Sequence, residues 1–115
     1  MTETTIPHND TINDLDRLTA LVAALKGQKQ AVVEAEVKIR TFTAQLTKMK
    51  LKGGNPQQLL FVGQQVEQVK GVFEATSMAI SFTRETLFEL FEKNKENTPF
   101  VLEWQKHFKL NEKPN

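Results

Sequence analysis

The sequence KGGNP at residues 52–56 separates two long stretches of helical sequence and decides the fold. Two adjacent glycines allow the left-handed backbone turn that often closes a helix. Asn55 is a residue type that caps the start of a helix, and Pro56 suits the first helical position. Residues 53–55 are therefore predicted to form the tip of a helical hairpin.

The stretch after the tip, residues 56–94, places side chains for one helical face at alternating spacings of three and four. This spacing continues for about 30 residues, whereas a strand would alternate at every second residue. The sequence therefore predicts a second long helix over this stretch. Its core-facing side consists of Leu59, Val62, Val66, Val69, Phe73, Thr76, Ile80, Thr83, Leu87 and Leu90.

The stretch before the tip, residues 12–52, has a seven-residue apolar repeat. The companion apolar position shifts its phase near Gly27, which is a stutter of the kind that alters coiled-coil winding. Alternatively, Gly27 ends a shorter first helix. We favour one continuous helix over residues 12–52. The repeat consists of Leu18, Leu25, Val32, Ile39 and Leu46.

The N-terminal end, residues 1–10, is polar and contains Pro7, so we expect a flexible tail there. Thr11 and Asp14 then resemble a capping arrangement, with an acid near the positive end of the helix dipole. The first helix is therefore expected to start beside Thr11.

The C-terminal end begins with a polar break at residues 93–97. Thr98 and Pro99 then predict the start of a short third helix over residues 99–110, followed by a polar tail at residues 111–115. This helix carries an aromatic patch, which we expect to dock against the second helix. The patch consists of Phe100, Trp104 and Phe108.

Together these elements predict one helical domain over residues 11–110. Two helices of about 40 residues are each roughly 60 Å long, and a tip of about four residues forces them to lie antiparallel. The expected fold class is all-α: a long antiparallel, coiled-coil-like helical hairpin plus a short C-terminal third helix.

The composition excludes several classes of protein. The 115 residues include no cysteine, which excludes disulfides, cysteine zinc sites and thiol catalysis. The net charge of +1 indicates neither a general nucleic-acid coat nor an acidic protein. The chain has no apolar run long enough for a transmembrane helix, and its N-terminus lacks the pattern of a signal peptide. We expect a soluble protein, either cytoplasmic or incorporated in a particle or apparatus.

No catalytic or metal-binding pattern is present. The two histidines, His8 and His107, lie far apart with no carboxylates at ligand spacing. Ser77 and Ser81 lie within the second helix without a histidine nearby in sequence to act as a base. We therefore expect no enzyme activity, no metal, no cofactor and no small-molecule substrate.

A second apolar stripe on the second helix is offset from its core-facing side. The third helix spans only about 16 Å and is too short to cover the stripe near the tip. A contiguous exposed apolar band is unusual on a monomer, so the cover near the tip must come from another chain or from the first helix folding back at Gly27. We predict that another copy or a partner helix packs there. The alternative is that Phe61 lies across the tip and Val72 is a tolerated surface residue. The predicted interface consists of Phe61, Val72, Ala75, Ala79 and Phe82.

Basic residues gather near the tip. Between residues 37 and 56 the chain carries five Lys or Arg residues and no acid. Such lysines complement the C-terminal end of a helix dipole and keep the protein soluble. A functional interpretation is that the tip binds an anion through backbone amides and neighbouring lysines. The residues of that candidate site are Lys48, Lys50, Lys52, Gly53 and Gly54.

The segment Asn55-Pro56-Gln57-Gln58-Leu59-Leu60, between two helices, resembles the tip of type III secretion needle subunits. Those subunits are also small helical hairpins, and they polymerise. The resemblance covers about six residues, and this chain is longer and has an added third helix. It illustrates that a hairpin of this kind can serve in assembly.

Two functions follow as hypotheses. The first is a non-enzymatic helical assembly or adaptor subunit that acts through self-association or partner-helix packing, such as a virion, secretion-apparatus or chaperone-like component. It would form a homo-oligomer or bind a partner protein. The alternative is a small regulator that binds nucleic acid or an acidic partner protein through the basic tip.

Overall fold

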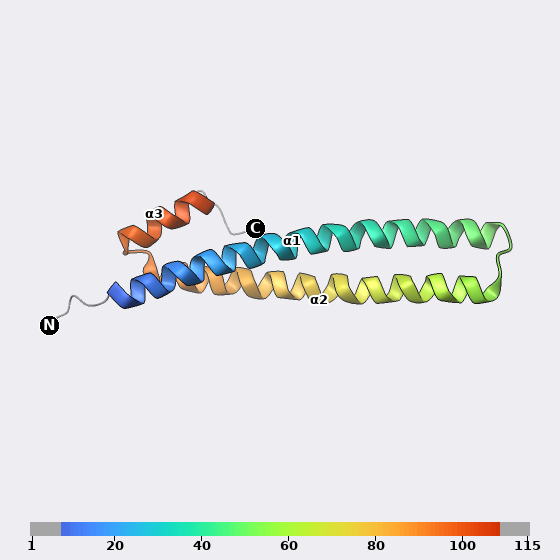
Figure 1. Cartoon of the computed structure of the whole chain (residues 1–115), viewed down its shortest axis with the longest axis horizontal. Helices are drawn as coiled ribbons and strands as arrows, with labels where there is room; N and C mark the ends of the chain where they lie inside the picture. Colours follow the sequence, from blue (N-terminus) through green and yellow to red (C-terminus); the bar gives the residue numbers. More distant parts are fainter. Residues whose placement is uncertain (1–7, 109–115) are drawn as a thin grey trace. The chain divides into compact units, whose positions relative to one another are not determined.

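The computed structural model describes residues 8–108, and three helices account for most of them (Figure 1). They are α1 (His8–Leu51), α2 (Pro56–Asn94) and α3 (Thr98–His107). The two long helices pack against each other as an antiparallel hairpin, and no strand occurs within residues 8–108. The predicted all-α fold class is therefore confirmed.

The chain forms two compact units. The three-helix unit combines Met1–Lys26 with Ser81–Asn115, and the hairpin unit is Gly27–Ile80. Helix α1 continues through Gly27 without interruption, although the boundary between the units falls there. Each unit has its own core.

The tip is built by short backbone hydrogen bonds. Gly53 has a φ of +68°, the left-handed conformation that favours glycine. Its amide donates to the Lys50 carbonyl at 3.2 Å, and the Gly54 amide donates to the Met49 carbonyl at 2.7 Å. Helix α2 then starts with a side-chain cap, because Asn55 Oδ1 accepts from the Gln57 amide at 2.8 Å.

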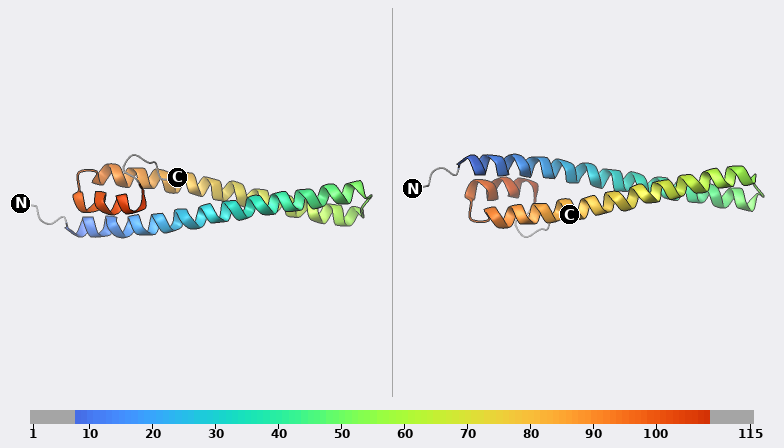
Figure 2. Two further views of the ribbon diagram at one scale, coloured as in Figure 1. Left: turned by 90° about the horizontal axis from the view of Figure 1, so that it is seen from above. Right: turned by 90° about the horizontal axis from the view of Figure 1, so that it is seen from below.

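In the three-helix unit, α3 lies alongside both α1 and α2 (Figure 2). Its Phe100 is fully buried and its Trp104 is 2% exposed. The Trp104 ring lies 4.7 Å from the Phe91 ring of α2 and 4.8 Å from the Phe108 ring, centroid to centroid. The aromatic patch therefore lies against α2. Phe100 and Trp104 are buried and are not available as a free surface.

The hairpin unit has a much thinner core. Among its described residues, the buried apolar side chains are Ala35, Val62, Val66 and Ile80. Two helices that pack side by side cover only one stripe of each other, so the flanks of that stripe stay open to solvent. Even so, the core-facing side of α2 that the three-four spacing predicts is buried or half-buried at every position.

The helix ends differ from the predicted ones in two places. Helix α1 begins at His8, so residues 8–10 are helical rather than part of a tail, and Thr11 lies inside the helix. No glycine or proline separates His8 from Ile12, so nothing in the backbone stops the helix from extending. The remainder of the predicted tail, residues 1–7, lies outside the described residues.

Helix α3 ends earlier than predicted. Its last residue is His107, and Phe108 has extended backbone angles, with φ −138° and ψ 147°. Its capping residue is Asn97, one position before the Thr98 that the sequence suggests, with Pro99 in the first turn. The predicted continuation to residue 110 and the tail at residues 111–115 lie outside the described residues.

Candidate interaction site

The five residues of the predicted interface are divided between the two units. Phe61, Val72, Ala75 and Ala79 belong to the hairpin unit, and Phe82 belongs to the three-helix unit. Phe61 is 61% exposed and Phe82 is 70% exposed, while Ala79 is half-buried. Val72 is 53% exposed, and Ala75 is also exposed. Four of the five side chains therefore present apolar surface to solvent, in two separate places.

One flank of the hairpin unit forms a groove of about 580 Å³, here called the aromatic groove. Phe42 and Met49 of α1 lie opposite Phe61 and Val62 of α2, and glutamines supply the rim. No charged side chain lines this groove. An apolar helix face could therefore pack there without removing a charge from water. The lining residues are Phe42, Gln45, Met49, Gln57, Gln58, Phe61, Val62 and Gln65.

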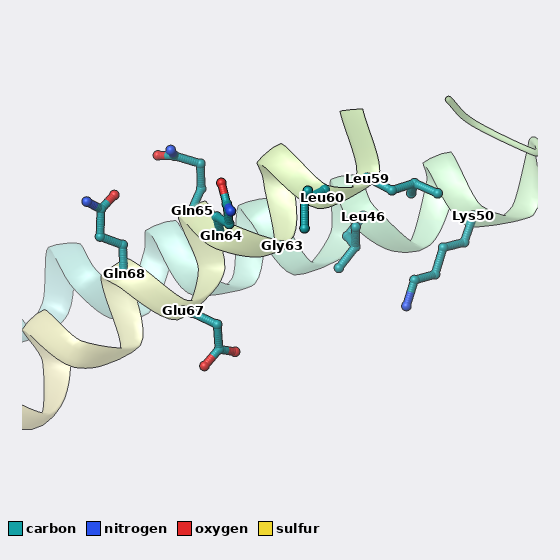
Figure 3. A pocket seen from close by; sticks show the side chains of 9 residues that line it. All are labelled: Leu46, Lys50, Leu59, Leu60, Gly63, Gln64, Gln65, Glu67 and Gln68. Atoms are coloured by element: carbon teal, nitrogen blue, oxygen red, sulfur yellow. The ribbon is translucent and has the colours of Figure 1, made fainter. Parts of the chain in front are cut away.

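A second groove of the hairpin unit, here called the leucine groove, has a volume of about 880 Å³ (Figure 3). Leu46, Leu59 and Leu60 lie between Lys50 at one end and Glu67 at the other. Gly63 leaves room in this groove, because a Cβ added there would meet nothing within 4 Å. The lining residues are Leu46, Lys50, Leu59, Leu60, Gly63, Gln64, Gln65, Glu67 and Gln68.

Two backbone donors of the predicted anion site at the tip already have partners within the chain. The amides of Gly53 and Gly54 both donate to carbonyls of α1, so neither is available to an anion. These glycines close the end of α1. Their N–H groups are used in closing the helix, so an anion at the tip could not accept hydrogen bonds from them. Lys48, Lys50 and Lys52 are all exposed, so only their ammonium groups remain for a partner.

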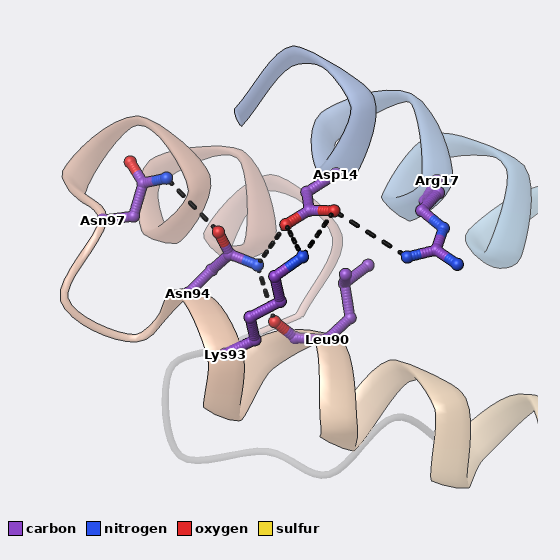
Figure 4. A network of polar contacts seen from close by, with 6 residues as sticks. All are labelled: Asp14, Arg17, Leu90, Lys93, Asn94 and Asn97. Carbon is purple, nitrogen blue, oxygen red and sulfur yellow. Dashed lines mark hydrogen bonds and ion pairs between the residues drawn. The ribbon is translucent and has the colours of Figure 1, made fainter. Parts of the chain in front are cut away.

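A buried carboxylate in the three-helix unit was not predicted from the sequence (Figure 4). Asp14 is 2% exposed and accepts a hydrogen bond from Asn94 Nδ2 at 2.9 Å. Lys93 Nζ lies 3.2 Å from Asp14 Oδ2, and Arg17 Nη1 lies 3.9 Å from Oδ1. Asn94 Nδ2 also donates to the Leu90 carbonyl at 2.9 Å. The network joins the start of α1 to the end of α2.

The charge state of Asp14 follows from these contacts. Burial by itself would raise the pKa of the Asp14 carboxyl, because it disfavours the charged form. The hydrogen bonds from Asn94 and Lys93 and the charges of Lys93 and Arg17 act in the opposite direction, and the pKa lies below its ordinary value of 3.8. Asp14 is therefore ionised at neutral pH.

The sequence does contain a signal for this network. Asp14 precedes Leu18 by four residues, and Asn94 follows Leu90 by four, so both continue the buried faces of their helices. A polar residue on a buried face needs a partner. Asp14 was instead interpreted as a capping residue, and Asn94 as part of a polar break.

Comparisons with protein-family models, with curated proteins and with solved structures find no match to this chain. The resemblance of residues 55–60 to needle subunits therefore gains no support from them. Within residues 8–108, no helix is long and apolar enough to cross a membrane. No group of three or more potential metal ligands occurs in that same part of the chain.

Proposed function

We propose that this protein is a non-enzymatic helical assembly or adaptor subunit. It acts by packing a helix of another copy, or of a partner protein, against the open flank of its hairpin unit. The aromatic groove is the site of this packing, and Phe61 is the most exposed of its apolar side chains. Complexes held together by helix packing would suit such a subunit.

A contrast between the two units supports this proposal. In the three-helix unit, α3 covers one side of the two long helices, and its Phe100 and Trp104 are buried. In the hairpin unit, no third helix from residues 8–108 fills the corresponding space. The apolar side chains left exposed there include Val37, Phe61 and Val72, each more than 50% exposed. A third helix from outside the chain would complete the same arrangement.

Light scattering on purified protein tests the proposal. The wild type is expected to associate with rising concentration over about 5–200 μM, the range of a moderate protein interface. Phe61→Glu places a charge at the aromatic groove and is expected to weaken association by about tenfold or more, because an unpaired charge would be desolvated.

The matched control is Val33→Glu. Val33 is 53% exposed, lies in the same unit and lines neither groove. This variant carries the same added charge and is expected to associate like the wild type. Equal losses in both variants would contradict the assignment of the groove. A wild type that stays monomeric throughout would remove self-association and leave only a foreign partner helix.

The second candidate function is a regulator that uses the lysines of the tip. Five Lys or Arg residues and no acid lie between residues 37 and 66, which supports binding of an acidic partner or nucleic acid. A salt titration of RNA and DNA binding, with a Lys48→Ala/Lys50→Ala/Lys52→Ala variant, tests it. Undetectable binding at low salt, or binding unchanged in the variant, would remove this candidate.

A further inference from the structure

The two units carry opposite net charge. The hairpin unit has seven Lys or Arg residues and four acids, for a net charge of +3. The rest of the chain has eight Lys or Arg residues and ten acids, for a net charge of −2. The two totals give the +1 of the whole chain. A second copy therefore offers an oppositely charged surface to each unit.

The positive charge of the hairpin unit lies beside the aromatic groove. Gln45 and Met49 line that groove, and Lys48 follows Gln45 by three residues on the same side of α1. Lys52 lies in the turn directly after α1, where its amide donates to the Lys48 carbonyl at 3.1 Å. Both lysines are exposed, and neither forms an ion pair with another described residue.

The matching surface is a short face of α2 in the three-helix unit. Phe82, Glu85 and Glu89 are spaced by three and four residues, so they lie on one side of the helix. Phe82 is 70% exposed, and both glutamates are exposed. Neither glutamate is ion-paired within the described part of the chain. This face thus combines one large apolar side chain with two unpaired carboxylates.

We propose that the aromatic groove of one copy takes the Phe82–Glu85–Glu89 face of a second copy, so that the protein assembles head to tail. This inference rests on the proposed function and specifies its partner. Phe82 enters the groove between Phe42 and Phe61, and the two carboxylates meet Lys48 and Lys52.

The spacing of the two surfaces fits when α2 of the second copy runs in the same direction as α1. Phe82 and Glu89 are seven residues apart, which is about 10.5 Å along a helix. Phe42 and Met49, which both line the groove, have the same separation. Phe82 set against Phe42 therefore brings Glu89 beside Met49, between Lys48 and Lys52.

Charge also disfavours the symmetric alternative, in which two hairpin tips pack on each other. The segment from residue 37 to residue 66 carries five positive charges and no negative one, so two such segments repel. The head-to-tail contact joins unlike surfaces, and it leaves one surface of each kind unused at the ends of a pair. Such a contact builds chains or rings rather than stopping at a dimer.

Charge reversal with mixing tests this arrangement. The acidic-groove variant is Lys48→Glu/Lys52→Glu, and the basic-face variant is Glu85→Lys/Glu89→Lys. Each alone is expected to associate about tenfold or more weakly than the wild type in sedimentation velocity, because like charges then face each other. An equimolar mixture is expected to regain association, since each variant then offers what the other needs. Rising salt is expected to weaken the wild-type assembly.

The matched control is Lys29→Glu/Lys70→Glu, which changes the net charge of the hairpin unit equally but away from the aromatic groove. It is expected to associate like the wild type. Far-UV circular dichroism of every variant verifies that the helices are intact.

Two outcomes would overturn the head-to-tail arrangement while leaving self-association in place. One is that both charge-reversal variants associate as strongly as the wild type, or that the wild-type assembly strengthens with salt. The other is an acidic-groove variant that pairs with the wild type while the basic-face variant behaves normally, because that pattern indicates tip-to-tip packing. A wild type that remains monomeric up to about 200 μM would overturn both this inference and the self-association on which it rests.

Discussion

Asp14 occupies a position where the helical period of α1 calls for an apolar side chain, four residues before the fully buried Leu18. Its carboxylate is paired rather than isolated, which is the condition under which a buried charge is tolerated. Lys93 and Arg17 are themselves more than half exposed, so their charges are partly screened by solvent. The Asn94 hydrogen bond is therefore the contact that fixes the geometry of the pair.

The substitution Asp14→Asn tests the role of this carboxylate. It keeps the shape but removes the charge and places an amide donor beside the donors of Asn94 and Lys93. The free energy of unfolding at neutral pH is expected to fall by about 1–3 kcal/mol. Urea denaturation followed by circular dichroism measures the change.

The pH dependence of that difference has a definite sign. The pKa of Asp14 is lowered in the folded protein, so its contribution to stability is present above the ordinary value of 3.8. It is lost as the pH falls from that value through the lower folded pKa. The gap between wild type and Asp14→Asn is therefore expected to narrow in acid, and a gap that widened there would contradict the charge assignment.

At the scale of the element, the helical stretches were predictable because their signal is repetitive. The core-facing side of α2 is defined by many positions that agree with one another, from Leu59 to Leu90. The tip was predictable because glycine, asparagine and proline each have a specific backbone role there. The start of α1 was not, since Thr11 resembles a cap while the residues before it are equally able to continue a helix.

Glycine substitutions separate the two backbone roles found in this chain. Gly53→Ala is expected to lower the free energy of unfolding by about 1–2 kcal/mol, because alanine is strained at its φ of +68°. Gly27→Ala is expected to raise it by about 0.5–1 kcal/mol, because Gly27 is helical and a Cβ there meets nothing within 4 Å. Thermal unfolding by circular dichroism measures both.

The two glycine substitutions are expected to change the free energy of unfolding in opposite directions, so each serves as a control for the other. A loss of stability in Gly27→Ala would mean that α1 is not helical at that residue. An unchanged stability in Gly53→Ala would mean that the tip does not need its left-handed turn.

At the scale of the whole molecule, the candidate site was only partly predictable. The second stripe on α2 follows from spacing within one helix, which the sequence displays. The aromatic groove needs Phe42 and Met49 of α1 to lie beside Phe61, and that depends on the register between two helices, which spacing within one helix does not give. The engaged amides of Gly53 and Gly54 were not predictable for a related reason, because their carbonyl partners are visible only in the folded turn.

The path of the chain after α2 explains why the two units differ. Beyond Asn94 the chain turns back and supplies α3 to the three-helix unit, where Trp104 anchors it. Within residues 8–108 no corresponding element follows the hairpin unit. The three-helix unit is thus covered by its own third helix, whereas the hairpin unit leaves the aromatic groove open.

The most direct test of this claim is the mobility of a spin label in the aromatic groove as the protein concentration rises. The chain has no cysteine, so Gln58→Cys gives a single label at the groove and Val33→Cys gives one outside it. If copies pack at the aromatic groove, the label at residue 58 becomes immobilised with rising concentration while the label at residue 33 keeps its mobility. A label at residue 58 that stays equally mobile at every concentration, or two labels that respond alike, would contradict it.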